Sequence, residues 1–61
     1  MKAYSSIAEV EIEVIATLAD FADEYDTEGI AREISDFDES GRLVADLERE
    51  DYWHIVAQYA A

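Results

Sequence analysis

Residues 7–25 have the sequence IAEVEIEVIATLADFADEY, which carries two competing hydrophobic periods. One period is helical, because apolar residues recur every three or four positions and form a single stripe: Ile7, Val10, Val14, Leu18, Phe21, Ala22 and Tyr25. Residues 9–14, EVEIEV, alternate with the period of a strand, and Glu11 interrupts the helical stripe. We predict a helix, because the helical stripe is longer and continues past the alternation. A short strand near residues 8–15 is the alternative, and Ser5 or Ser6 is the expected cap of the helix.

The remaining segments also favour helices. A second helix is expected to begin at Asp26-Thr27 and to end near Ser35, and a third to cover residues 50–60. Residues 36–41 predict a turn, while residues 42–47 suit either a helical turn or a short extended piece. The chain is free of proline, so the backbone rarely forbids helix. We therefore predict an all-α fold, a bundle of three to four short helices in one domain spanning residues 1–61; the alternative is α+β with the strand near residues 8–15.

Composition sets the class of protein. Sixteen acidic and four basic side chains give a formal net charge of -12, while 51% of the residues are apolar. That apolar content favours a folded domain over disorder. With no cysteine and one histidine, neither disulfides nor a structural zinc site can stabilise so small a core. Oligomerisation, for example as a homodimer, is the remaining means, and the acidity can also be an adaptation to high salt.

The charge and the apolar runs indicate which partners to expect. The first residues lack the apolar stretch of a signal peptide, and no apolar run reaches the length of a membrane span. We therefore expect a cytoplasmic protein. Its negative charge repels anionic lipid and nucleic acid, so neither a membrane nor a nucleic acid is an expected direct partner.

The acidic residues of the first predicted helix fall on the side opposite its apolar stripe: Glu9, Glu13, Asp20, Asp23 and Glu24. At 1.5 Å per residue this row is ~22 Å long. Its charge spacing approaches that of one DNA strand. Five further carboxylates extend it: Asp26, Glu28, Asp36, Asp38 and Glu39. Trp53, at the edge of the last apolar stripe, is the expected aromatic anchor of a partner interface.

Residues 36–43, DFDESGRL, resemble the start of an EF-hand calcium loop. Asp36, Asp38 and Ser40 occupy the first three ligand positions, and Gly41 follows where the loop needs glycine. The twelfth position is Leu47 instead of glutamate. A degenerate calcium site is therefore an alternative interpretation only, and we expect no cofactor.

An enzyme is not expected. His54 is the sole histidine, and neither cysteine nor a glycine-flanked serine accompanies it. Carboxylate pairs can be drawn almost anywhere in so acidic a chain and so indicate no particular reaction.

Two segments, Ser5-Ser6-Ile7-Ala8-Glu9-Val10 and Asp23-Glu24-Tyr25-Asp26-Thr27-Glu28-Gly29-Ile30-Ala31-Arg32, resemble the acidic helical parts of ArdA-type antirestriction proteins. The resemblance covers residues 5–37 and rests on acids around tyrosines and small apolar residues. It implies a product of a phage or mobile element that imitates DNA and occupies the DNA-binding groove of a host defence enzyme. The predicted partner is thus a basic nucleic-acid-binding host protein, such as a restriction, CRISPR or transcription protein. A helical interaction or dimerisation module is the rival interpretation.

Overall fold

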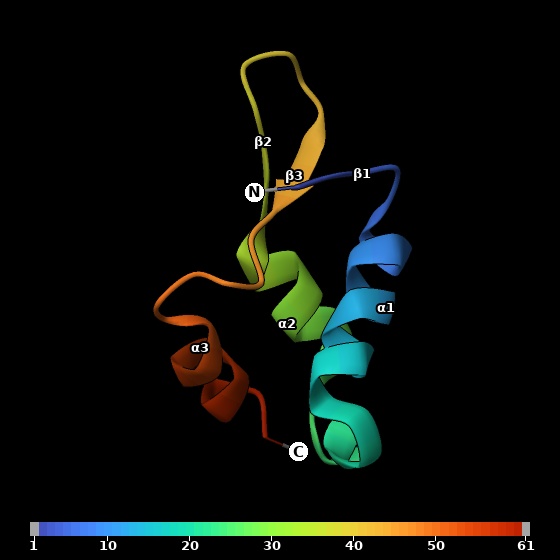
Figure 1. The fold of residues 1–61 in the computed structure, drawn as a ribbon, viewed down its shortest axis with the longest axis vertical. Helices are drawn as coiled ribbons and strands as arrows, with labels where there is room; N and C mark the ends of the chain where they lie inside the picture. Colours follow the sequence, from blue (N-terminus) through green and yellow to red (C-terminus); the bar gives the residue numbers. More distant parts are fainter. Residues whose placement is uncertain (1, 61) are drawn as a thin grey trace.

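Helices and a small antiparallel sheet share this chain, of which the computed structural model describes residues 2–60 (Figure 1). In chain order the elements are β1 (Lys2–Tyr4), α1 (Ile7–Leu18), the 3₁₀ helix η1 (Ala19–Glu24), α2 (Thr27–Ile34), β2 (Ser35–Phe37), β3 (Leu43–Ala45) and α3 (Tyr52–Gln58). The fold is mixed α+β, so the predicted all-α bundle is wrong. The strands are too short for a period of two to be visible in the sequence, which is why the prediction missed them.

The sheet has the order β1-β3-β2, and both pairings are antiparallel. Lys2 and Ser35 flank Ala45, while Tyr4 and Phe37 flank Leu43. The central strand β3 is buried throughout, as expected of a strand with neighbours on both edges. The open question about residues 42–47 is therefore answered by a strand, and the alternative strand near residues 8–15 is wrong as well.

Residues 8–15 are helical, as predicted, and lie within α1. Ser6 is the N-cap: its side chain accepts a hydrogen bond from the backbone N–H of Glu9. The Glu9 carboxylate accepts in return from the backbone N–H of Ser5 at 2.6 Å, so donors at the start of the helix are satisfied in both directions. The helix ends at Leu18 and not at Tyr25.

The early end of α1 coincides with Ala19, whose φ of 51° lies in a region that favours glycine. The chain then continues as the 3₁₀ helix η1, which reaches Tyr25. Ala22 and Tyr25 pack against the core from there, whereas Phe21 turns outward. The apolar stripe therefore lies on one α-helix only as far as Leu18, because a change of helix type changes which side chains share a face.

Helix α2 begins and ends where the sequence predicted. Asp26 accepts a hydrogen bond from the backbone N–H of Gly29 at 3.1 Å and caps the helix. At the other end the Ser35 hydroxyl donates to the carbonyl of Ala31, and the chain enters β2 directly. The predicted last helix is also present, as α3.

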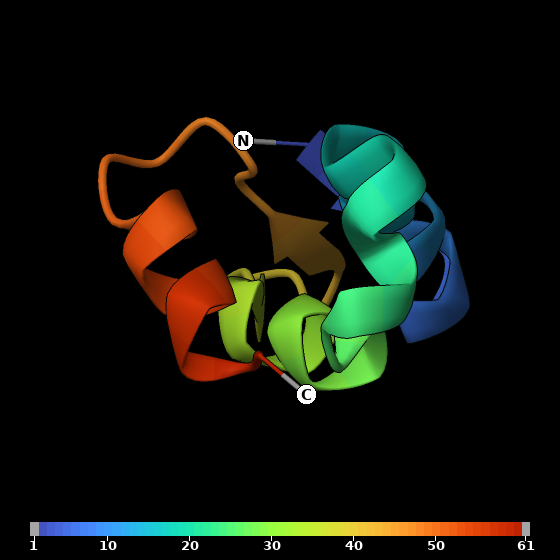
Figure 2. The same cartoon turned by 90° about the horizontal axis from the view of Figure 1, so that it is seen from below.

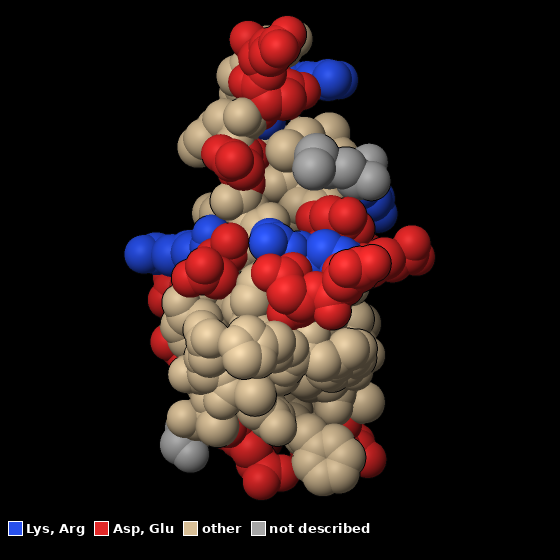
Figure 3. All heavy atoms as spheres, turned by 90° about the vertical axis from the view of Figure 1, so that its left-hand side faces the viewer, with Lys and Arg blue, Asp and Glu red and all other residues tan. Residues whose placement is uncertain are grey.

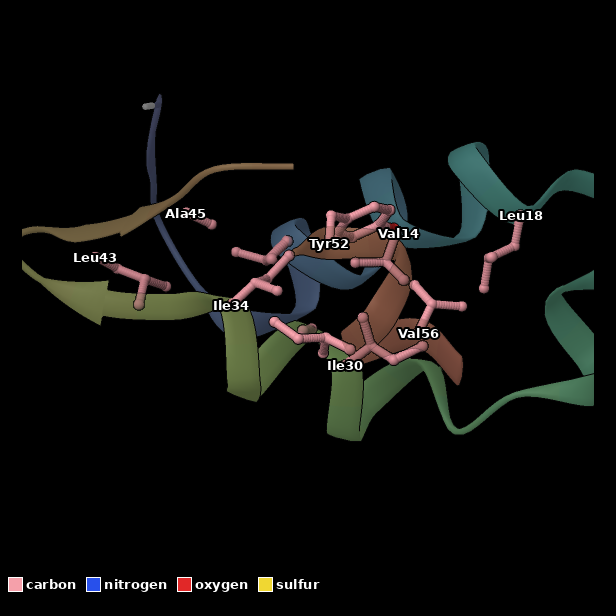
Figure 4. Close-up of a cluster of buried hydrophobic side chains, with 11 residues drawn as sticks. Val14, Leu18, Ile30, Ile34, Leu43, Ala45, Tyr52 and Val56 are labelled. Carbon is pink, nitrogen blue, oxygen red and sulfur yellow. The ribbon is translucent and has the colours of Figure 1, made fainter. Parts of the chain in front are cut away.

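The core lies where the three helices meet the inner face of the sheet (Figure 4). α2 lies between α1 and α3, as the view from below shows (Figure 2). The eleven buried residues of the core are Val10, Val14, Leu18, Ile30, Ala31, Ile34, Leu43, Ala45, Tyr52, Ile55 and Val56. Burial of each large aliphatic side chain contributes about 1.5–3 kcal/mol. These residues hold together all three helices and the central strand.

Glu11, the acid inside the apolar stripe, has a structural partner. The Thr27 hydroxyl donates a hydrogen bond to its carboxylate at 2.6 Å, which links α1 to the first turn of α2. A polar side chain at the edge of a core is tolerated when such a bond satisfies it.

Candidate protein-interaction surface

The surface charge is strongly unbalanced at the level of individual side chains. Each of the four basic residues forms an ion pair with one carboxylate: Lys2 with Glu13, Arg32 with Glu28, Arg42 with Asp38 and Arg49 with Asp51. Among the described residues, twelve of the sixteen carboxylates therefore have no lysine or arginine partner: Glu9, Glu11, Asp20, Asp23, Glu24, Asp26, Glu33, Asp36, Glu39, Asp46, Glu48 and Glu50. No charged side chain in residues 2–60 is buried. The excess negative charge thus lies at the surface.

The predicted row of five carboxylates does not form one straight line. Glu9 and Glu13 lie on α1, whereas Asp20, Asp23 and Glu24 lie on η1 beyond the break at Ala19. The length expected for a single α-helix therefore does not apply, because the backbone changes direction and helix type within the row. The three carboxylates of η1 form a separate, exposed acidic group.

Several predicted site residues have structural roles. Glu9 and Asp26 bond backbone N–H groups at the starts of α1 and α2. Glu28 pairs with Arg32 at 2.9 Å. Hydrogen bonds from Tyr4 and Lys2 lower the pKa of Glu13.

The predicted turn at residues 36–41 falls in the β2-β3 hairpin, but Asp36 and Phe37 belong to strand β2, so the turn itself covers residues 38–42. One Asp38 carboxylate oxygen accepts from the backbone N–H groups of Ser40 and Arg42, each at 2.9 Å, and the other accepts from the Arg42 side chain. These bonds, led by the one from the Arg42 backbone, lower the pKa of Asp38. Asp36 accepts from the backbone N–H of Phe37.

The structure of this segment differs from that of an EF-hand calcium loop. An EF-hand loop joins two helices. Residues 38–42 join two strands, β2 and β3, and the ligand candidate Asp38 is already bonded within the turn. Within the described part of the chain, no group of three histidine, cysteine, aspartate or glutamate side chains is placed to hold a metal ion.

Trp53, the predicted anchor, is 60% exposed on α3. Its ring meets the ring of the buried Tyr52 edge to face, with centroids 5.0 Å apart. The Tyr52 hydroxyl in turn bonds the Thr17 hydroxyl of α1 at 2.5 Å. The indole is therefore exposed but rests on a ring that the core holds in place.

The outer side of α3 is free of formal charge. The sequence from Tyr52 to Ala60 contains no acidic, lysine or arginine residue, and its exposed side chains are Trp53, His54, Ala57, Gln58 and Ala60. Figure 3 shows an uncharged area on this side of the molecule, with a band of mixed acidic and basic side chains above it and acidic side chains below it. In a chain of this charge, such an area is an exception that the sequence analysis did not single out.

Two further aromatic rings are exposed, and the sequence analysis assigned neither to a site. Phe21 of η1 is 63% exposed and Phe37 of β2 is 69% exposed. The apolar stripe predicted from the sequence includes Phe21, and Phe37 falls in the predicted acidic turn. Their acidic neighbours, Asp20 beside Phe21 and Asp36 and Asp38 beside Phe37, were the available signal.

A groove of about 760 Å³ lies between β1, the first turns of α1 and the hairpin. Exposed Ile12 and Phe37 line it, together with Lys2 and Arg42. Both cations are already paired, with Glu13 and Asp38. Glu9, which has no lysine or arginine partner, lines the groove as well, so the groove combines an apolar rim with a negative charge.

Comparison of the chain with protein-family models, curated proteins and solved structures gives no match. Among residues 2–60, no helix has both the length and the apolar character needed to cross a membrane.

Proposed function

We propose that this protein is an acidic inhibitor that imitates nucleic acid and blocks the nucleic-acid-binding groove of a basic protein. The observation that carries the proposal is the set of twelve surface carboxylates without a lysine or arginine partner. The resemblance to ArdA-type proteins supports the same role, with a phage or mobile element as the source and a host defence or DNA-binding protein in the host cytoplasm as the target.

A strongly acidic surface acts on a basic partner before the two proteins touch. A net charge of -12 repels itself and lowers stability, but it also attracts basic surfaces and accelerates their association. An ordinary solvated helix face carries both acidic and basic side chains, which form stabilising ion pairs between residues three or four positions apart. Here η1 carries three exposed acids and no base, so its charge is available to a partner.

The test is competition with nucleic acid. Proteins captured from host lysate on the immobilised chain at low salt are challenged with increasing salt and with excess DNA. The proposal predicts steep loss with salt, because the contact replaces counterions on the basic groove, and release by DNA. Capture that survives both salt and DNA contradicts it.

A matched pair of variants locates the contact. The triple variant Asp20→Asn, Asp23→Asn, Glu24→Gln removes three carboxylates without cation partners. The control Glu13→Gln, Glu28→Gln, Asp51→Asn removes the same formal charge from three carboxylates that are already paired. We expect the first to weaken binding more than the second; equal effects would show that η1 is not part of the contact.

A helical interaction or dimerisation module is the second candidate, and the uncharged outer side of α3 favours it. This role predicts binding that survives neutralisation of Glu9, Glu13, Asp20 and Asp23 but is lost when Trp53 or Tyr52 is replaced. Binding would then depend little on salt, which separates the two candidates in the same assay.

A further inference from the structure

Two large apolar side chains that are exposed, Ile12 of α1 and Phe37 of β2, line the same groove although they come from different elements. Their exposed fractions are 65% and 69%. Single exposed apolar side chains are common on protein surfaces, but apolar side chains that gather at one concave site mark a place where a partner binds. The groove volume of about 760 Å³ lies within the range of ~300–1,000 Å³ that is typical of binding pockets.

The sheet forms one side of this groove. Tyr4, Leu43 and Phe37 lie opposite one another in the register of the three strands, so their side chains form one row across the sheet. All three line the groove. The pairing of β1 with β3 ends at Tyr4 and Leu43, and the hairpin of β2 and β3 extends beyond it (Figure 1). The apolar row thus ends at the ring of Phe37, on an edge strand of the sheet.

The first turns of α1 form the other side. Glu9, Ile12 and Glu13 are three or four positions apart, which places them on one face of the helix, and all three line the groove. Val10 and Val14 point into the core instead. The alternating sequence of residues 9–14 therefore divides between two faces of α1, and Ile12 is the apolar member that the core does not use.

The charge of the groove is negative. Lys2 and Arg42 line it, but each is held in an ion pair with a carboxylate, at 3.2 Å and 2.9 Å respectively. Glu9 has no lysine or arginine partner among residues 2–60. Its Oε1 atom accepts a hydrogen bond from the backbone N–H of Ser5, a neutral donor that leaves the carboxylate its charge. A ligand that fits must therefore bring both apolar surface and a cation.

We propose that this groove binds a peptide segment of a basic partner protein in which an arginine lies between apolar side chains. The apolar side chains contact Ile12 and Phe37, and the guanidinium pairs with Glu9. Arginine suits this site because its planar group pairs with carboxylates and also packs on aromatic faces.

Charge complementarity selects this occupant over the others. A second copy of the chain brings a further charge of -12, and its four basic side chains are already in ion pairs. Nucleic acid and anionic lipid are repelled by the same charge. A segment of a different, basic protein is attracted by it, and the apolar sides of the groove then favour a segment that also carries apolar side chains.

This inference goes beyond the proposed function, because it does not depend on imitation of nucleic acid. The acidic group of η1 follows the last turn of α1, whereas the groove lies at the first turns of that helix (Figure 1). Variants of η1 and competition with DNA test the proposed function, and variants of the groove test this inference. Either can fail while the other stands.

The probe is a synthetic pentapeptide, Gly-Leu-Arg-Leu-Gly, with both ends blocked so that it carries a single charge. Titration into the ¹⁵N-labelled protein, followed by NMR, should shift the backbone signals of Glu9, Ile12 and Phe37 in a saturable way and leave those of η1 in place. A peptide with serine for both leucines should bind at least about tenfold more weakly, because the apolar contact is lost. A peptide with glutamine for arginine should bind about two- to fivefold more weakly.

Matched variants of the protein locate the contact. Phe37→Ala should weaken binding of the peptide by about tenfold, whereas Phe21→Ala, at a ring that is 63% exposed on η1, should leave it unchanged. Glu9→Gln keeps the acceptor for the Ser5 N–H and removes only the charge, so binding should weaken about two- to fivefold. Glu50→Gln makes the same change at an exposed carboxylate outside the groove and should have no effect.

Three results would overturn the inference. They are the absence of saturable shifts at millimolar peptide, shifts that do not include the groove, and equal losses in Phe37→Ala and Phe21→Ala. Ile12→Ala provides a second test of the apolar contact and should also weaken binding by about tenfold. The signals of the core residues in each variant's spectrum check that the fold is retained.

Discussion

Replacement of Gly29 by alanine tests the packing of α2 against α3, because two effects of the added methyl group oppose each other. Gly29 lies in the first turns of α2, and Tyr59 follows the end of α3. A Cβ at position 29 would come within 2.6 Å of the Tyr59 ring and 2.7 Å of the Asp26 carboxylate. Both distances are shorter than any ordinary carbon contact.

The Tyr59 ring has little room to retreat. Its hydroxyl donates to Glu33 at 3.0 Å, and its backbone carbonyl accepts from the N–H of Asp26 at 2.8 Å. Forcing an extra carbon into such a contact costs about 1–3 kcal/mol. Alanine gains roughly 0.8–1.0 kcal/mol over glycine in a helix. We therefore expect Gly29→Ala to lower the free energy of unfolding by about 1 kcal/mol, or about 4–8 °C in Tm for a domain of this size.

Urea unfolding followed by circular dichroism measures this effect, and a double-mutant cycle isolates its cause. In a Tyr59→Ala background the clash with the ring is gone and the remaining close contact, with the end of the Asp26 side chain, is relieved by a small shift of that carboxylate, so Gly29→Ala should raise stability by up to about 1 kcal/mol through helix propensity. The change of sign corresponds to a coupling of about 2 kcal/mol between the two positions. A stabilising Gly29→Ala in the unaltered protein would refute the contact between α2 and Tyr59.

Three further predictions concern single positions. Ser6→Ala should cost about 1 kcal/mol in urea unfolding, because it removes the cap of α1; Ser5→Ala, which keeps the backbone N–H that bonds Glu9, should cost clearly less, and equal losses would contradict the cap. Ala19→Gly should stabilise by about 1 kcal/mol, because Ala19 has a φ of 51°; Ala16→Gly, inside α1, should instead destabilise by a similar amount, and a destabilising Ala19→Gly would contradict the backbone conformation. Burial and a neighbouring carboxylate raise the pKa of Tyr4 to about 12 from 10.0, so its contribution to stability is present below pH 10.0 and lost as the pH rises through about 12. Ultraviolet titration should show that Tyr4→Phe removes a phenol that ionises near that pH; loss of one that ionises near 10.0 would contradict the packing.

The helices were largely predictable because their signals are local. Ser6 and Asp26 cap α1 and α2 close to the expected positions, and α2 ends beside Ser35 as expected. The end of α1 was not predictable, because an alanine at φ 51° has no signature in the sequence. The stripe that continued to Tyr25 concealed the break, since Ala22 and Tyr25 still reach the core from η1.

The strands were missed for a different reason. Each has three residues, and each gains its identity from pairing with a segment far away in the chain, as Tyr4 pairs with Leu43. Such pairing depends on where the helices place the strand ends, which no local period reports. The apolar run Leu43-Val44-Ala45 was a visible but ambiguous hint, because short apolar runs suit buried strands and helical turns alike.

The candidate surface, too, was predictable only in part from the sequence. Composition alone determined that the surface would be acidic, because sixteen acids cannot be buried in a 61-residue chain and four bases cannot neutralise them. Only the tertiary structure decided that Lys2 pairs with Glu13 and which aromatic rings face outward. The Lys2–Glu13 ion pair joins β1 to α1, whereas the other three ion pairs join residues two or four positions apart, and Phe21 leaves the core because α1 ends at Leu18. Total charge is a sum over residues and needs no fold, whereas exposure and the pairing of residues from distant segments exist only once the chain has packed.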